Sequence, residues 1–269
     1  MHEGLHMNIG IVGLGVVGAA CRNGFESIGH TVLYHDIKLN TSIEDVLNTE
    51  LVYICVPTST LDNGDCDVSI LTDIVQNLVD NKYAGIVAIK STVPPGTTQG
   101  LTDSTNLRIC FVPEFLREWC ADDDFKLNHT LLAVGCNDNT VFDIVKESHG
   151  NLPKQIKQLT SIEAEILKYY SNAFNSLRIV FANTMFELCD SFDADYNKIK
   201  ETFLLRKTAS PDYMNCSSEM RGFGGVCLPK DIKALIKIFD DCGLNYDLIK
   251  SIESDNNKFK KTIRKGMRE

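Results

Sequence analysis

A glycine-rich turn between a strand and a helix constrains this chain more than any other feature. The GxGxxG pattern at residues 13–18 directly follows an apolar run, Asn8–Val12, and opens a stretch with helical spacing, Val16–Ile28. Glycines there permit a tight turn, close approach of the backbone to a pyrophosphate and close packing of helix on strand. The helix N-terminus then faces the phosphate charge. The predicted cofactor contacts in this turn are Gly13, Gly15, Val16, Val17 and Gly18.

Strand and helix patterns alternate through the first 158 residues, and several strands are continuous apolar runs. This alternation predicts a mostly parallel sheet, buried on both sides, with crossover helices on both faces. The expected fold is therefore α/β, a Rossmann-type doubly wound parallel sheet. The expected strands are 8–12, 31–35, 51–56, 85–90, 107–112 and 130–134, and the expected helices between them are 16–28, 68–79 and 141–147.

The pattern changes near residue 158. From Thr160 to Phe192 the chain has no Gly and no Pro, and apolar residues recur every three to four positions. A helix of about 30 residues is roughly 45 Å long, which suits a domain spine or a dimer contact better than the flank of one small sheet. We predict two domains: residues 1–158, a cofactor-binding sheet domain in which residues 1–7 are a tag or an alternative start, and residues 159–269, a smaller all-helical domain with a long central helix.

An acidic residue supports the dinucleotide prediction. Asp36 ends the second predicted strand, where a carboxylate accepts hydrogen bonds from the adenosine ribose and repels a 2′-phosphate. NAD is therefore favoured over NADP, although Lys38 weakens this preference; the alternative is a structural turn beside a solvated Asp. Pro57 and Thr58, and the loop at 91–97 that contains Thr92, follow the third and fourth strands, where ligands bind in open α/β sheets.

The segment at 221–231 carries the strongest chemical signal. Cys227 precedes Pro229, which fits the first position of a helix, and Lys230 follows. A thiol at a helix N-terminus beside a cation is stabilised as the nucleophilic thiolate. Asp231, four residues on, shares a helix face with Cys227 and could hold a water or a hydroxyl. The alternative is a buried cysteine near a helix start, the usual place of any one of ten cysteines.

Two further pairs of polar residues could take part in catalysis. Glu114 and Glu118 follow the fifth strand, and paired carboxylates can divide acid, base and water-orienting duties. Lys168 and Asn172 lie four apart on the long helix, where they could stabilise an oxyanion. The alternative for the first pair is that two carboxylates lie in a surface loop by chance. The alternative for the second is that the pair belongs to the solvated stripe of an amphipathic helix.

These motifs occur in an order that resembles the UDP-glucose/GDP-mannose dehydrogenase family, from Asn8 to about Asn257. The resemblance rests on STVPPGT at 91–97, PEFLRE at 113–118 and GFGGVCLPKD at 222–231. The forms PEFLRE and CLPKD resemble the branch that acts on UDP-glucose or GDP-mannose rather than on N-acetylated sugars.

The resemblance implies NAD-dependent oxidation of the C6 alcohol of a nucleotide sugar, with UDP-glucose favoured, to a uronate in two hydride transfers. Cys227 would form the thiohemiacetal and thioester, Lys168 and Asn172 would stabilise the oxyanion, and Asp231 would position the water. The remaining implied roles are water positioning for Thr92, general base for Glu114, a place near the nicotinamide for Glu118, and a sugar pocket lined by Phe115, Leu116, Phe223, Gly224 and Gly225.

The chain also departs from the family. Trp119 stands where a small residue is usual, the loop at 203–220 lacks a DxRIG-type segment, and a third, nucleotide-closing domain is expected to be missing. The alternatives are therefore a non-catalytic NAD-binding subunit, a fragment or partnered enzyme, and a β-hydroxyacid dehydrogenase, which would leave CLPKD unexplained. The basic tail is either a solvated helix end or a phosphate or partner contact, and its members are Lys258, Lys260, Lys261, Arg264, Lys265 and Arg268.

Composition narrows the partners. The net charge of −9 argues against nucleic acid and acidic membranes. No apolar run approaches the roughly 20 residues that a membrane span needs. The ten cysteines form no CxxC pair and no metal-type cluster, which indicates reduced thiols, a cytoplasmic location and no metal. The expected partners are a nucleotide-sugar substrate and a second copy of the chain, bound through the long helix.

Overall fold

The structure is a computed structural model that describes residues 6–225 and 227–259 of the chain. It divides into two compact units. In the described part, the first contains residues up to 61 and 66–168, and the second contains residues 62–65 and 169 onward. The division falls inside the long helix, whereas the domain boundary predicted after residue 158 remains a prediction.

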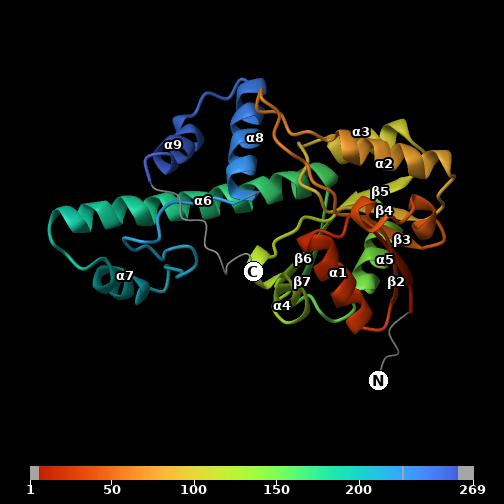
Figure 1. Ribbon diagram of the computed structural model, residues 1–269, viewed down its shortest axis with the longest axis horizontal. Coiled ribbons are helices and arrows are strands. Elements are labelled where there is room, and N and C mark those ends of the chain that lie inside the picture. Colours follow the sequence, from red (N-terminus) through yellow and green to blue (C-terminus); the bar gives the residue numbers. More distant parts are fainter. Residues whose placement is uncertain (1–5, 226, 260–269) are drawn as a thin grey trace. The chain divides into compact units, whose positions relative to one another are not determined.

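The first unit is built on a seven-stranded sheet in the order β2-β1-β3-β4-β5-β6-β7 (Figure 1). All neighbouring pairs are parallel except β5 and β6, which meet antiparallel at Phe111 and Gly135. The predicted Rossmann-like α/β class is therefore confirmed. The strand order reverses between β2 and β3, on either side of β1, and ligands bind at such switch points. The strands are β1 (Asn8–Val12), β2 (Thr31–His35), β3 (Leu51–Ile54), β4 (Ile86–Ile89), β5 (Arg108–Phe111), β6 (Leu131–Gly135) and β7 (Gln155–Leu159).

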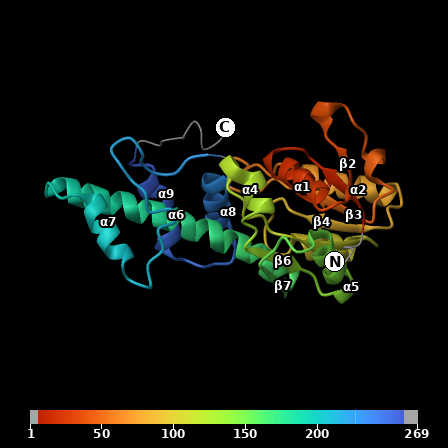
Figure 2. The ribbon, with the colours of Figure 1, turned by 90° about the horizontal axis from the view of Figure 1, so that it is seen from below.

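Helices cover both faces of the sheet, as Figures 1 and 2 show. Phe25, Phe125 and Val145, from α1, α4 and α5, pack with Ile9 and Ile11 of β1 on one face. Leu71 and Leu78 of α2 pack with Ile54 of β3 on the other. Met7, set aside with residues 1–6 in the sequence analysis, is buried in the first of these clusters. The helices are α1 (Val16–Ser27), α2 (Ser69–Asp80), α3 (Thr97–Ser104), α4 (Ala121–Lys126) and α5 (Asn139–His149).

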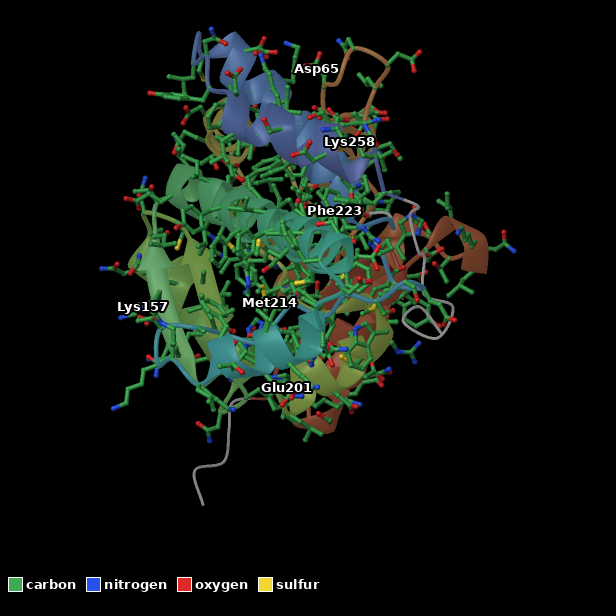
Figure 3. The ribbon with its side chains drawn as sticks, turned by 90° about the vertical axis from the view of Figure 1, so that its left-hand side faces the viewer. Asp65, Lys157, Glu201, Met214, Phe223 and Lys258 are labelled. Atoms are coloured by element: carbon green, nitrogen blue, oxygen red, sulfur yellow. The ribbon has the colours of Figure 1, made fainter. Side chains whose placement is uncertain are left out.

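The second unit is helical. Two apolar clusters hold it together: Met214 packs with Tyr196 and Cys189 between α6 and α7 (Figure 3), and Phe223 packs with Ile232 and Ile252. No helix in the described residues is long and apolar enough to cross a membrane. The helices are α6 (Ser161–Ser191), which begins in the first unit, α7 (Tyr196–Leu204), α8 (Cys227–Asp241) and α9 (Asp247–Asn256).

One predicted helix start is corrected. The sequence pattern places Pro229 at the first helical position, but α8 begins at Cys227, so proline is the third residue. Proline is tolerated in the whole first turn, because the N–H groups there have no acceptor within the helix. Cys227 itself therefore occupies the N-terminal end of α8.

Candidate active site

The turn after β1 forms a cradle that fits a pyrophosphate. A Cβ on Gly13, whose φ is +91°, would lie 2.9 Å from the carbonyl oxygen of Cys55, and one on Gly18 would lie 1.9 Å from that of Gly13. These two glycines permit the turn and the packing of α1 upon it. Gly15 is exposed, and a Cβ there meets no atom of the described residues within 4 Å. No side chain caps α1 and no acid lies in its first turn, so its positive N-terminal end is open to an anion.

Asp36 lies against this turn, one residue after β2 rather than at its end. Its Oδ2 accepts a hydrogen bond from the backbone N–H of Leu14 at 2.6 Å, and its Oδ1 accepts one from Lys38 at 2.8 Å. The bond from Leu14 is the main reason that the pKa of Asp36 is lowered. Each carboxylate oxygen has a second lone pair, so the side chain can still accept from a ribose hydroxyl.

The loops after β3 and β4 are bonded to each other. The hydroxyl of Thr58 donates to the carbonyl of Thr92 at 2.7 Å, and that of Ser91 donates to the carbonyl of Val56 at 2.7 Å. Pro57, between the bonded residues, is exposed. The structure therefore brings Pro57, Thr58 and Thr92 together at one edge of the sheet.

A buried carboxylate that was not predicted from the sequence lies behind the second loop. Glu165 of α6 accepts hydrogen bonds from the backbone N–H groups of Gly96 at 2.5 Å and Thr98 at 2.8 Å. It thereby caps the N-terminus of α3, while burial raises its pKa. Its position three residues before Lys168 on one helix is the signal that could have identified it.

Glu114, after β5, is held at three atoms. Its Oε1 accepts from the backbone N–H of Leu116 at 2.5 Å, its carbonyl accepts from the ammonium of Lys168, and its Oε2 lies 3.5 Å from Nζ of Lys90. Lys168 also lies 5.8 Å from the ring centre of Phe115. Glu114 and Lys168 are buried, which contradicts the interpretation of Lys168 as part of a solvated stripe. Lys90 was not among the site residues predicted from the sequence.

Glu118 lies further along this segment, in the short helix η3 (Glu118–Cys120), and is half-buried. Its neighbour Trp119 is exposed, and the guanidinium of Arg117 stacks 4.9 Å from the tryptophan ring. Arg117 also pairs with Asp124 at 2.5 Å. This pairing gives the loop that follows Glu114 a defined conformation.

In the second unit, a cluster of polar side chains lies at the start of α8. The amide of Asn172 donates to Oδ2 of Asp231 at 2.5 Å, and Nζ of Lys230 lies 2.7 Å from Oδ1. Asp231 and Asn172 are buried, whereas Cys227, one turn before Asp231, is exposed. A helix N-terminus favours the thiolate over the thiol.

Two asparagines that the sequence analysis missed hold the glycine loop before Cys227. Asn183 of α6 accepts from Gly222 N–H at 2.9 Å and from Nε of Arg221 at 2.8 Å. Asn256, at the end of α9, accepts from Phe223 N–H at 2.8 Å and donates to its carbonyl at 2.9 Å. The ring of Phe223 is in the core, and Asn256 bonds both its backbone N–H and its carbonyl. Gly224 and Gly225 follow, half-buried.

Neither a metal site nor a site in the basic tail is found among the described residues. The described residues contain no group of three or more His, Cys, Asp and Glu side chains that could hold a metal ion. In the basic tail, Lys258 pairs with Asp255 at 2.6 Å. The remaining five members lie outside the described residues: Lys260, Lys261, Arg264, Lys265 and Arg268.

Comparison with known proteins identifies the family of both units. Residues 38–152 match the NAD binding domain of the UDP-glucose/GDP-mannose dehydrogenase family, and residues 162–258 match its central domain. UDP-glucose 6-dehydrogenase of Rickettsia bellii (strain RML369-C) is 30% identical over 223 residues, which cover 79% of this chain and 50% of the relative. That of Bacillus subtilis (strain 168) is 27% identical over 294 residues, covering 93% and 66%. The chain thus spans about half the length of the Rickettsia relatives.

Solved structures agree with this assignment. A UDP-glucose dehydrogenase from Pyrobaculum islandicum matches with a TM-score of 0.87 and 25% identity, over 96% of this chain and 69% of that one. A 3-hydroxyisobutyrate dehydrogenase from Mycobacterium tuberculosis matches with a TM-score of 0.74 over 95% and 94%, but at 13% identity, so the likeness is one of fold alone. The cofactor prediction is confirmed at the level of the NAD-binding domain. Because the two family models together match well over half of its residues, the chain belongs to the UDP-glucose/GDP-mannose dehydrogenase family.

Proposed function

We propose that this chain carries the NAD-binding and central parts of a dehydrogenase that oxidises the C6 alcohol of a nucleotide sugar, with UDP-glucose favoured, to the uronate. One observation carries the proposal: an exposed thiol at the N-terminus of α8 lies one turn from a buried Asp231 bonded to Asn172. A hydroxyacid dehydrogenase of similar fold has no use for this thiol. The cytoplasm, where thiols stay reduced, suits such a nucleophile.

Each residue has a role that its chemistry supports. Bound NAD⁺ accepts the hydride in each oxidation. Glu114 takes the proton of the C6 hydroxyl, and the thiolate of Cys227 adds to the resulting aldehyde to form a thiohemiacetal. Lys168 and Asn172 stabilise the negative oxygen of this adduct. After the second oxidation gives a thioester, Asp231 and Thr92 position the water that forms the carboxylate and expels the thiolate.

The remaining candidate residues have supporting roles. Glu118 contributes on the nicotinamide side, and the backbone from Phe223 to Gly225 lines the sugar pocket with Phe115 and Leu116. The cofactor is held by the glycine turn, Asp36 and the Pro57–Thr58 loop.

An exposed apolar stripe supports a homodimer. Tyr170, Phe174, Phe181 and Leu188 of α6 are each about half exposed or more. At 100° per residue, these four positions fall within about 40° of one another around the helix. A stripe this narrow matches the same stripe of a second copy, as in a helix–helix seam. Light scattering of wild type and of Phe181→Glu tests it: a dimer that the substitution dissociates is expected, and a wild-type monomer would contradict the proposal.

The decisive experiment measures NADH formed from UDP-glucose, beside GDP-mannose and UDP-N-acetyl sugars. Wild type is expected to form two NADH per UDP-glucose, and Cys227→Ser to lose this turnover by several orders of magnitude. Cys242→Ser is the matched control, because Cys242 is also exposed and lies just past the other end of α8. Turnover that survives in Cys227→Ser refutes the thioester route. NAD binding without any turnover supports a non-catalytic subunit or a part that needs a further domain.

A further inference from the structure

Lys90 is a buried cation at the carboxyl end of the sheet. It directly follows β4, its backbone N–H donates to the carbonyl of Ile54 at 2.9 Å, and 3% of its side chain is exposed. Lysine is almost never buried unless it is paired, because removing the ammonium from water is energetically unfavourable. A methionine would fill the same space without this penalty, which indicates that the charge itself has a role.

The counter-charge comes from Glu114. Its side chain is 10% exposed, and its Oε2 lies 3.5 Å from Nζ of Lys90. Because Leu116 N–H already occupies Oε1, Lys90 acts on the other oxygen. A separation of 3.5 Å is longer than a good hydrogen bond, so Oε2 keeps a lone pair for a water or a hydroxyl. The ammonium of Lys168 approaches from α6 but bonds the Glu114 carbonyl, so it does not replace Lys90.

Within the described ranges, the other groups that act on Lys90 supply no carboxylate. Nζ lies 5.7 Å from the ring centre of Tyr53 in β3, and the thiols of Cys21 in α1 and Cys55 after β3 also act on it. Burial lowers the pKa of Lys90, but the attraction of Glu114 and of these thiols outweighs burial and leaves the pKa raised. Lys90 is therefore an ammonium throughout the neutral range.

The charge of Lys90 also lowers the pKa of two histidines, His129 and His149. Burial is the main reason that the pKa of His129 is lowered to about 4 and that of His149 well below its ordinary value. The charge of Lys90 is the second reason for both. Both rings are therefore neutral at pH 7 and add no second cation beside Glu114. The buried charge near this carboxylate thus comes from Lys90 on the strand side and Lys168 on the α6 side.

We propose that Lys90 is a positioning residue for Glu114: its buried ammonium pairs with Oε2 of the Glu114 carboxylate and holds that oxygen in place at the end of β5. The inference rests on the proposed function, in which Glu114 takes a proton from the sugar hydroxyl. A general base must be ionised when substrate binds, and a buried carboxylate without a cation resists ionisation.

The test observes Glu114 directly, by carbon NMR titration of the whole chain labelled at glutamate carboxyl carbons. Glu114→Gln identifies the signal. In Lys90→Met we expect the Glu114 midpoint to rise by about 1–3 pH units, as loss of a close opposite charge predicts. Lys90→Arg, which keeps the charge, should largely restore it. Lys146→Met, at an exposed position of α5, removes one charge elsewhere and should leave the midpoint unchanged.

An unmoved midpoint in Lys90→Met overturns the proposal. Should circular dichroism show that this variant is unfolded, Lys90→Gln gives the same comparison with a polar neutral side chain. In turnover assays, the acid limb of kcat/KM should move to higher pH by a similar amount, with KM for NAD little changed. The titration does not depend on turnover. A wild type without activity therefore counts against the proposed function, while the Glu114 midpoint still decides the role of Lys90.

Discussion

Gly15→Ala should separate cofactor binding from stability at the turn after β1. Gly15 has φ −68° and ψ −165°, which alanine adopts without strain, and in the part of the chain that the structure describes its Cβ would meet no atom within 4 Å. Because alanine also restricts the unfolded chain, the free energy of unfolding should stay within about 1 kcal/mol of wild type. The same Cβ occupies space that the pyrophosphate needs, since the second glycine of this pattern is where the backbone approaches it.

The size of the effect follows from linkage. NAD at 100 times the wild-type Kd stabilises the folded chain by about 2.7 kcal/mol. For a chain of this size that corresponds to a rise in Tm of about 5–11 °C. If the added methyl group weakens binding 100-fold, the same NAD concentration contributes only about 0.4 kcal/mol, a rise of about 1–2 °C.

Thermal unfolding without NAD reports the stability of the variant. Unfolding with NAD, supported by titration calorimetry, reports its affinity for the cofactor. Gly18→Ala is the comparison, because its Cβ would lie 1.9 Å from the carbonyl of Gly13. That variant should lose about 1–3 kcal/mol even without cofactor. If Gly15→Ala keeps the full NAD-induced rise in Tm, the N-terminus of α1 is not the pyrophosphate site and the reasoning is refuted.

Two further predictions concern stability. Asn256→Ala leaves the N–H and carbonyl of buried Phe223 without their partner, so urea unfolding should show a loss of about 2–3 kcal/mol; a loss below about 0.5 kcal/mol would contradict the role of this clamp. Burial lowers the pKa of His149 well below its ordinary value and that of His129 to about 4. The unfolded chain therefore takes up protons first, so stability is complete above about pH 6.5 and falls toward pH 4. His149→Phe, whose ring would pack on Phe125, should make this fall shallower in urea unfolding between pH 7 and 5, and an unchanged slope would show that His149 is not its source.

The elements that were not predicted from the sequence, such as β7 and α3, lack a local signal, each for its own reason. β7 has the sequence QIKQL and lies at the sheet edge, where most of its side chains are exposed, so the apolar signal of a buried strand is absent. The start of α3 follows Pro94 and Pro95 and has no side-chain cap of its own from Gly96. Its cap comes from Glu165, 67 residues from Thr98. The residues around α3 therefore do not indicate that Glu165 caps it.

What the sequence determined by itself is the local architecture and the list of reactive groups. Continuous apolar runs specify strands buried on both faces, the glycine turn specifies an open helix N-terminus, and the uninterrupted apolar period from Thr160 specifies α6. Which groups meet was decided only by the tertiary structure. Lys90 meets Glu114 because β4 and β5 are neighbouring strands, and Asn256 meets Phe223 across 33 residues because α9 packs beside the loop. Hydrogen bonds and ion pairs depend on distance in space, and that distance exists only once the sheet and helices have packed.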